Sequence, residues 1–168
     1  MGFKSRKSNR VLSIDLYSRG FAYVVMEGPT RLVDWGIKSN RKGGDRLILE
    51  KMLKLIQWSK PEITILEDHH HASSLKRTRM TRIHQLILTG LKHHEIQFLT
   101  VTRENILETF EPFGASTKFD IARQIIRLLP ELEDHLPPLR KAWMSEDPRI
   151  NIFDAVALTW AAQSRRVK

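Results

Sequence analysis

The stretch RVLSIDLYSRGFAYVVM, residues 10–26, predicts two β-strands joined by a short turn. Apolar and β-branched residues fill both halves, and the turn Tyr17-Ser-Arg-Gly20 ends in glycine, as expected of a hairpin. Asp15 stands inside the first half among residues suited to a core. A buried carboxylate is costly unless it is paired or bound to a cation, so Asp15 is the first candidate for a functional residue.

The rest of the chain alternates between strand and helix patterns. Strands are predicted over residues 31–38, 62–67 and 96–101, and helices over about 43–60, 73–92, 103–110, 116–129 and 147–164. Residues 130–148 carry four prolines and are expected to form an irregular connection. This order of elements is typical of a single α/β domain in which helices cover a mixed sheet.

The composition indicates one globular domain with an anionic partner. The chain has 168 residues, no cysteine, and 28 Lys and Arg against 19 Asp and Glu, a formal net charge of +9. We expect residues 1–9 to be a basic flexible tail and residues 10–168 to form the domain. The absence of cysteine excludes disulfides and thiolate zinc sites, and the sequence shows no targeting or membrane-spanning segment. A soluble, cytoplasmic protein is therefore expected.

The positive charge is concentrated in the middle of the chain. No acid occurs between Asp68 and Glu95. The candidate nucleic-acid contacts there are Lys76, Arg77, Arg79 and Arg82. The alternative is a solvated helix face without a partner. The apolar stripe of the same predicted helix, Met80, Ile83, Ile87 and Leu91, fits either a dimer interface or core packing.

Three acids stand where folding alone would not place them. Glu67 ends the strand PEITILE, and Asp154 interrupts the apolar helix NIFDAVALTWAA. If the strands that carry Asp15 and Glu67 are parallel neighbours, both acids meet near their carboxyl ends, where open α/β sheets keep their sites. Converging carboxylates favour a hard cation such as Mg²⁺ or Mn²⁺. Alternatively, Asp15 and Glu67 are solvated strand-end residues, and Asn151 with Asp154 forms a helix-capping pair.

The chain resembles the RuvC-type Holliday junction resolvases of the RNase H-like superfamily. The matching motifs, in chain order, are RVLSIDLYSRGFAYVV, PEITILE, GASTKFDIARQIIRLL and NIFDAVALTWAA. The resemblance spans about residues 10–162 and rests on the order and spacing of these motifs. It implies an RNase H-like α/β fold, with a mixed five-stranded sheet in the order 3-2-1-4-5 and helices on both faces.

The resemblance also implies an activity, that of a Mg²⁺-dependent crossover-junction endodeoxyribonuclease. Asp15, Glu67 and Asp154 would bind two Mg²⁺ or Mn²⁺ ions, and hydrolysis would leave 5′-phosphate and 3′-hydroxyl ends. Lys118 would lie near the scissile phosphate. The family usually has an acid or histidine at the position of Asn151, so we expect weaker metal binding or slower chemistry here. A homodimer acting on branched DNA is also implied.

Other positions depart from the family pattern and leave alternatives open. His69, His70 and His71 follow Glu67, where resolvases commonly place an aromatic residue. His70 is a candidate nucleic-acid contact, and a polar loop without a special task is the alternative. The family's second lysine has no counterpart near residues 103–107, where Arg103 is the nearest cation. Two other functions therefore stay open: a nuclease for structured RNA or RNA–DNA hybrids, and a protein of this fold that binds nucleic acid without cutting it.

Overall fold

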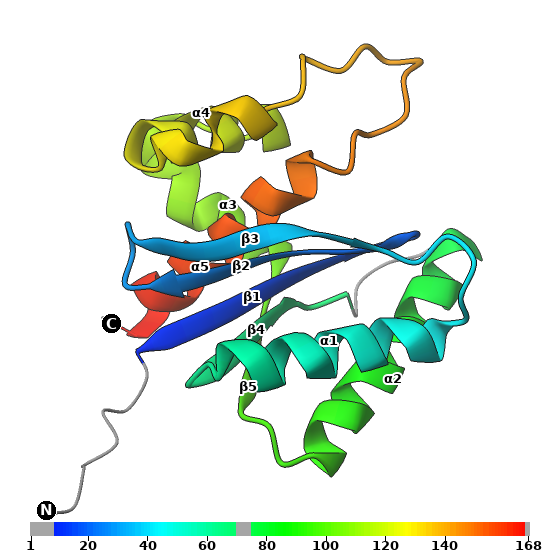
Figure 1. Cartoon of the computed structure of the whole chain (residues 1–168). Helices are drawn as coiled ribbons and strands as arrows, with labels where there is room; N and C mark the ends of the chain where they lie inside the picture. Colours follow the sequence, from blue (N-terminus) through cyan, green and yellow to red (C-terminus); the bar gives the residue numbers. More distant parts are fainter. Residues whose placement is uncertain (1–8, 70–74, 167–168) are drawn as a thin grey trace, which may run out of the picture.

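A computed structural model of the chain describes residues 9–69 and 75–166. Its strands are β1 (Arg10–Tyr17), β2 (Gly20–Glu27), β3 (Leu32–Ser39), β4 (Ile63–Glu67) and β5 (Phe98–Val101). They form one sheet in the order β3-β2-β1-β4-β5, which confirms the predicted order (Figure 1). The strand β1 runs antiparallel to β2 and parallel to β4, so the sheet is mixed. Of the predicted basic tail, residues 1–8 lie outside the described residues.

The hairpin predicted from residues 10–26 is present. Strand β1 pairs with β2 along its whole length, from Arg10 opposite Glu27 to Tyr17 opposite Gly20. Gly20 adopts a φ of +151°, and a Cβ atom at this position would collide with the backbone carbonyl of Lys38 on β3. Glycine is therefore required where the turn enters the sheet.

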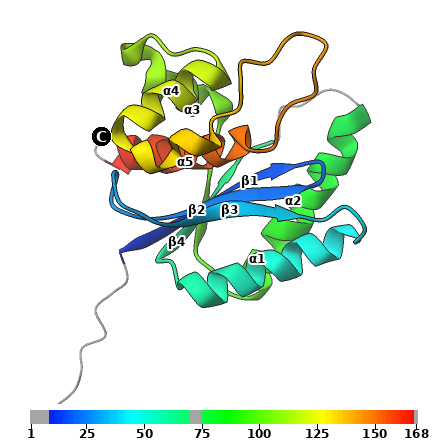
Figure 2. The same cartoon turned by 45° about the horizontal axis from the view of Figure 1, so that its top comes forward.

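Helices cover both faces of the sheet, as expected. They are α1 (Asp45–Ser59), α2 (Leu75–His93), α3 (Arg103–Phe110), α4 (Lys118–Leu128) and α5 (Ile150–Arg166), with two 3₁₀ helices, η1 (Glu111–Phe113) and η2 (Pro130–His135). Helices α1 and α2 lie on one face, and α3, α4 and α5 lie on the other (Figures 1 and 2). No helix in the described ranges is long and apolar enough to cross a membrane.

The apolar stripe of α2 belongs to the core. Ile83, Ile87 and Leu91 are fully buried and pack with Leu12 and Ile14 of β1. This stripe contributes to the fold of the single chain, so the core-packing alternative is correct for these residues.

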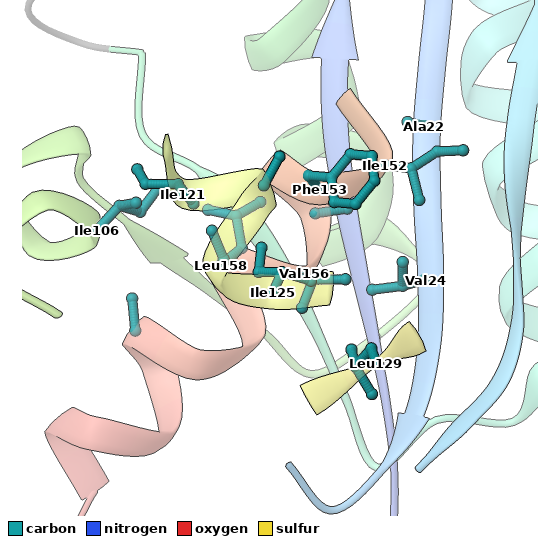
Figure 3. Packing of buried hydrophobic residues seen from close by; sticks show 14 of the residues in the cluster. Ala22, Val24, Ile106, Ile121, Ile125, Leu129, Ile152, Phe153, Val156 and Leu158 are labelled. Atoms are coloured by element: carbon teal, nitrogen blue, oxygen red, sulfur yellow. The ribbon is translucent and has the colours of Figure 1, made fainter. Parts of the chain in front are cut away.

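The opposite core lies between the sheet and α5. Val156 of α5 lies beside Val24 of β2 and Phe153 lies nearer Ala22, while Ile121 and Ile125 of α4 belong to the same cluster (Figure 3). Within α5, small side chains at Ala155, Ala157 and Ala161 are fully buried. A helix with this composition can pack closely against the sheet on one side and against α3 and α4 on the other, because these side chains are short.

The structure differs from the sequence prediction in the region before α5. The helix begins at Ile150 rather than at the Asp147-Pro148 pair, because the preceding backbone bonds are turn-like, with the amide of Ile150 donating to the carbonyl of Asp147. Asp147 still caps this turn, since its carboxylate accepts from the backbone N–H of Arg149 at 2.9 Å. The proline-rich stretch 130–148 is also partly regular, because η2 forms at its start, and His135 there accepts a hydrogen bond from the indole of Trp35.

Candidate active site

The parallel pairing of β1 with β4 brings Asp15 and Glu67 to the same edge of the sheet. Ile14 lies opposite Leu66 in the register, and the next residues on the two strands are Asp15 and Glu67. Side chains alternate between the faces of a strand, so Asp15 projects on the same face as Ser13. The hydroxyl of Ser13 is hydrogen-bonded to that of Thr159 on α5, at 2.7 Å. Asp15 therefore faces α5.

Helix α5 supplies Asp154 to this face. Asp154 and Asn151 lie one turn apart on the helix and are 2% and 4% exposed, and Asp15 is 4% exposed. Because α5 begins at Ile150, Asn151 is inside the helix and is not its N-cap. The capping-pair alternative for Asn151 and Asp154 is therefore wrong.

Lys118 reaches the acids from the first turn of α4. Gly114, with a φ of +67°, turns the chain after η1, and Thr117 then caps α4 in a reciprocal capping box with Asp120. This local structure places Lys118 at the first helical position. Its ammonium lies 2.8 Å from Oδ2 of Asp154.

Arg103 approaches the same carboxylate from the other side. The side chain of Thr102 caps α3, so Arg103 also occupies the first position of its helix. Its guanidinium lies 3.5 Å from Oδ1 of Asp154. Both oxygens of this buried acid therefore have a cationic neighbour, and Arg103 occupies the region where the sequence has no second lysine.

Glu146 was missed by the sequence analysis. Its carboxylate accepts a hydrogen bond from Lys118 at 2.7 Å, so Lys118 bridges Asp154 and Glu146. Glu146 is in the irregular part of the proline-rich stretch, where no periodic pattern marks which side chains face the core. Only the fold, which returns this segment past the start of α4, reveals its position.

Burial and neighbouring charges raise the pKa values of Asp15 and Glu67. Burial raises the pKa of Asp15 well above its ordinary value, and the negative charges of Asp154 and Glu67 raise it further. Burial also raises the pKa of Glu67, although nearby His69 opposes this effect. Burial alone would lower the pKa of Lys118, but the carboxylates of Asp154 and Asp15 outweigh burial and raise it. The environment of these acids therefore favours protonation of Asp15 and Glu67 and keeps Lys118 charged.

Among the candidate nucleic-acid contacts on α2, the structure describes the side chains of Arg79 and Arg82. Arg79 lies 3.4 Å from the carboxylate of Asp45 at the start of α1, and Arg82 is exposed. The side chains of Lys76 and Arg77 lie outside the described residues, as do His70 and His71. His69 packs edge-to-face against His84, with ring centroids 5.4 Å apart.

The donor set at this end of the sheet is chemically suited to a hard divalent cation. Asp15, Glu67, Asp154 and Asn151 offer only oxygen ligands of the type that Mg²⁺ and Mn²⁺ prefer. Burial is the main cause of the raised pKa values of Asp15 and Glu67, and the charge of Asp154 adds to it. Among residues 9–69 and 75–166, no three acidic or histidine side chains are already arranged to hold a metal ion. The cations that contact Asp154 there are Lys118 and Arg103.

Comparison with known proteins identifies the architecture. No protein-family profile and no curated protein sequence matches the chain. Among solved structures, RuvC from Thermus thermophilus in complex with a Holliday junction substrate matches with a TM-score of 0.66, over 94% of this chain and 95% of that chain. The chain has the RuvC fold. A second T. thermophilus RuvC structure matches with a TM-score of 0.60, over 94% and 96% of the two chains.

The likeness to RuvC is one of backbone architecture. Sequence identity is 12% with the first RuvC structure and 14% with the second. The sheet order 3-2-1-4-5 that the resemblance implied is confirmed. Within this RuvC fold, the three candidate acids Asp15, Glu67 and Asp154 are brought together from β1, β4 and α5, with Lys118 beside them.

Proposed function

We propose that this protein is a metal-dependent endonuclease that cleaves phosphodiester bonds in branched DNA. The observation that supports this proposal is the convergence of Asp15, Glu67 and Asp154 beside Lys118, at the carboxyl ends of β1 and β4 in a RuvC fold. The excess of basic residues over the whole chain is suited to a polyanionic substrate. The T. thermophilus RuvC with the same fold was solved with a Holliday junction substrate.

The residues that would hold divalent ions are Asp15, Glu67 and Asp154, with the amide oxygen of Asn151 as a neutral donor. Divalent ions held by these residues would supply Lewis-acid activation of water and stabilisation of the leaving oxygen, and hydrolysis of this kind would leave 5′-phosphate and 3′-hydroxyl ends. Each aspartate in this set is almost entirely buried, which holds its carboxylate in position.

Lys118 and Arg103 compensate charge in this proposal, and Lys118 has a second role as a phosphate contact. Without a bound divalent cation, they offset the repulsion among the acids, since both contact Asp154. The ammonium of Lys118 stays protonated because its pKa is raised. Its side chain is 39% exposed, so it can also contact a phosphate that enters from solvent. Lys118 would then neutralise charge that develops on the phosphoryl group.

The proposed assembly is a homodimer, in which two copies of the site act on two strands. The apolar stripe of α2 is used by the chain's own core. Such a dimer would therefore form through another surface.

The test is a cleavage assay on a labelled four-way junction beside linear duplex, single strand and RNA–DNA hybrid. Each substrate is incubated with Mg²⁺, Mn²⁺ or EDTA, and Asp15→Asn is the matched control. Metal-dependent nicks near the crossover that disappear in the variant would support the proposal. Cleavage that persists in Asp15→Asn would overturn the assignment of the site. Preferential cleavage of the RNA–DNA hybrid would change the proposed substrate from branched DNA to RNA–DNA hybrid.

A second candidate function is binding of branched nucleic acid without cleavage. Two observations favour it: Asn151 contributes no charge, and both oxygens of Asp154 already have cationic neighbours. This alternative predicts salt-sensitive junction binding that is the same in EDTA and in Mn²⁺, with no cleavage in either. Metal-dependent cleavage by the parent protein would exclude it.

A further inference from the structure

The segment between η2 and α5 displays apolar side chains to solvent. Residues 137–147, here called the 137–147 loop, stand away from the body of the protein (orange in Figures 1 and 2). Trp143 is 81% exposed, Leu139 is 67% exposed and Met144 is 45% exposed. Soluble proteins seldom expose a group of large apolar side chains without a partner for it.

Glu146 links the 137–147 loop to the candidate active site. Glu146, at the end of the loop, accepts a hydrogen bond from Lys118, and Lys118 contacts Asp154. A ligand on the loop would therefore lie close to a phosphate held at the acids. Asp147, the next residue, is occupied by its hydrogen bonds with Arg149.

A cavity of about 440 Å³ lies between the loop and the start of α4. Its walls include apolar side chains, among them Phe119, Leu139, Met144 and Ile150. The charged side chains in the lining are Lys118, Arg140, Glu146 and Asp147, of which Glu146 is paired with Lys118 and Asp147 with Arg149. A volume of this size is within the range of small-ligand sites. Apolar walls combined with cations suit a flat, uncharged ring attached to a phosphate.

Trp143 and Lys141 form a pair on the same loop. The ammonium of Lys141 lies 5.3 Å from the centroid of the Trp143 ring. Proteins that bind unpaired nucleic acid combine aromatic rings, on which bases stack, with basic side chains that contact the backbone. Because Glu146 and Asp147 are bonded to Lys118 and Arg149, Arg140 and Lys141 provide the remaining charge of the loop.

We propose that the 137–147 loop binds an unpaired nucleobase of the substrate, stacked on the indole ring of Trp143, beside the cavity. This inference deepens the proposed function and takes nucleic acid as the ligand of the candidate active site. A base inside a regular duplex is covered by its neighbours, whereas a base at a branch point or in a single strand can expose its face. The loop would thus favour branched or single-stranded substrates over linear duplex.

The test measures binding in EDTA, so it does not depend on catalysis. Affinities of Trp143→Ala, Trp143→Phe and the parent are compared on a four-way junction, a single strand and a linear duplex at one salt concentration. Trp58→Ala is the matched control, because Trp58 is 60% exposed but lies on α1, on the opposite face of the sheet. We expect Trp143→Ala to weaken junction and single-strand binding about tenfold and duplex binding less than about twofold. Trp143→Phe should keep most of the affinity, and Trp58→Ala should match the parent.

Three results would overturn the inference. The first is that Trp143→Ala loses as much affinity for the duplex as for the junction, and the second is that it loses no affinity for any substrate. The third is that sedimentation velocity shows a change from dimer to monomer in Trp143→Ala that accounts for the lost affinity. The last result would identify the loop as a contact between two copies of the chain. Failure of the proposed nuclease function would be seen separately, as absence of metal-dependent cleavage despite junction binding.

Discussion

The ammonium of Lys118 bridges two carboxylates, that of Asp154 at 2.8 Å and that of Glu146 at 2.7 Å. Asp154 is buried and Glu146 is exposed, so the bridge runs from the interior of the protein to its surface. Breaking an ion pair of this kind leaves an uncompensated buried charge.

We expect Lys118→Met to lower the free energy of unfolding by about 1–3 kcal/mol in EDTA, because Asp154 then keeps only Arg103 as a cationic neighbour. Urea unfolding measures the change. The control is the double variant Lys118→Met with Asp154→Asn, which should recover much of the loss. Additive effects in this double-mutant cycle would contradict an energetic coupling between the two residues.

Asp15→Asn should stabilise the metal-free protein. The folded state raises the pKa of Asp15 through burial and through repulsion by Asp154 and Glu67. The folded state therefore binds a proton more tightly than the unfolded state, and stability falls as pH rises above the ordinary value of 3.8. The neutral amide removes this loss. A gain of about 1 kcal/mol corresponds to about 2–4 °C in Tm for a chain of this size.

Thermal unfolding in EDTA from pH 4 to pH 8 tests this expectation. The advantage of Asp15→Asn over the parent should grow as pH rises, then reach a plateau. Ser13→Ala, two residues away on the same face of β1, is a control that leaves the acids unchanged. An advantage that is independent of pH would show that titration of Asp15 is not its cause.

Asn151→Asp should strengthen metal binding at the expense of metal-free stability. The substitution adds a carboxylate one turn from Asp154 in a buried position. We expect a lower Tm in EDTA, recovery with Mn²⁺, and Mn²⁺ affinity about tenfold higher by calorimetry, since affinity increases with ligand charge. Asn151→Ala is the control and should not gain affinity. Equal Mn²⁺ binding by Asn151→Asp and the parent would place residue 151 outside the metal site.

Arg82 and Arg79 should contribute differently to binding. Arg79 lies beside Asp45, whereas Arg82 is exposed, so only Arg82 is expected to contact phosphate strongly. Arg82→Ala should reduce the slope of log affinity against log salt by about one, and Arg79→Ala should change it less. Fluorescence anisotropy with a labelled junction between 50 and 200 mM salt measures both. Identical slopes in both variants and the parent would exclude Arg79 and Arg82 as phosphate contacts.

The part of the site that lies on regular elements could be predicted from the sequence. Asp15, Glu67 and Asp154 each interrupt or end an apolar run, and a charge in such a place is visible without a structure. Helix and strand order followed from periodicity in the same way. The sequence predicts Asp147 as the N-cap of α5 and Pro148 as its first residue, whereas the helix begins at Ile150, because a proline after an aspartate is equally compatible with a turn before a helix.

The contacts of irregular segments could not be predicted. Glu146 and Trp143 lie in a stretch without periodicity, and their positions depend on how the chain returns from η2 to α5. The pairing of Arg79 with Asp45 likewise depends on the packing of α2 beside α1. Each of these contacts joins segments that are distant in the sequence, and no local sequence pattern indicates that the two segments meet.

Core packing beneath α5 affects the distance between the acids of the candidate active site. Ala155 is fully buried in the layer where the helix packs on the sheet, one turn before Thr159, which is hydrogen-bonded to Ser13 of β1, and Asp154 is carried by the same helix. An added methyl group in that layer would push the helix outward and carry Asp154 away from Asp15 without altering either acid. The spacing of the acids is therefore adjustable by evolution through the volume of side chains that never touch a substrate.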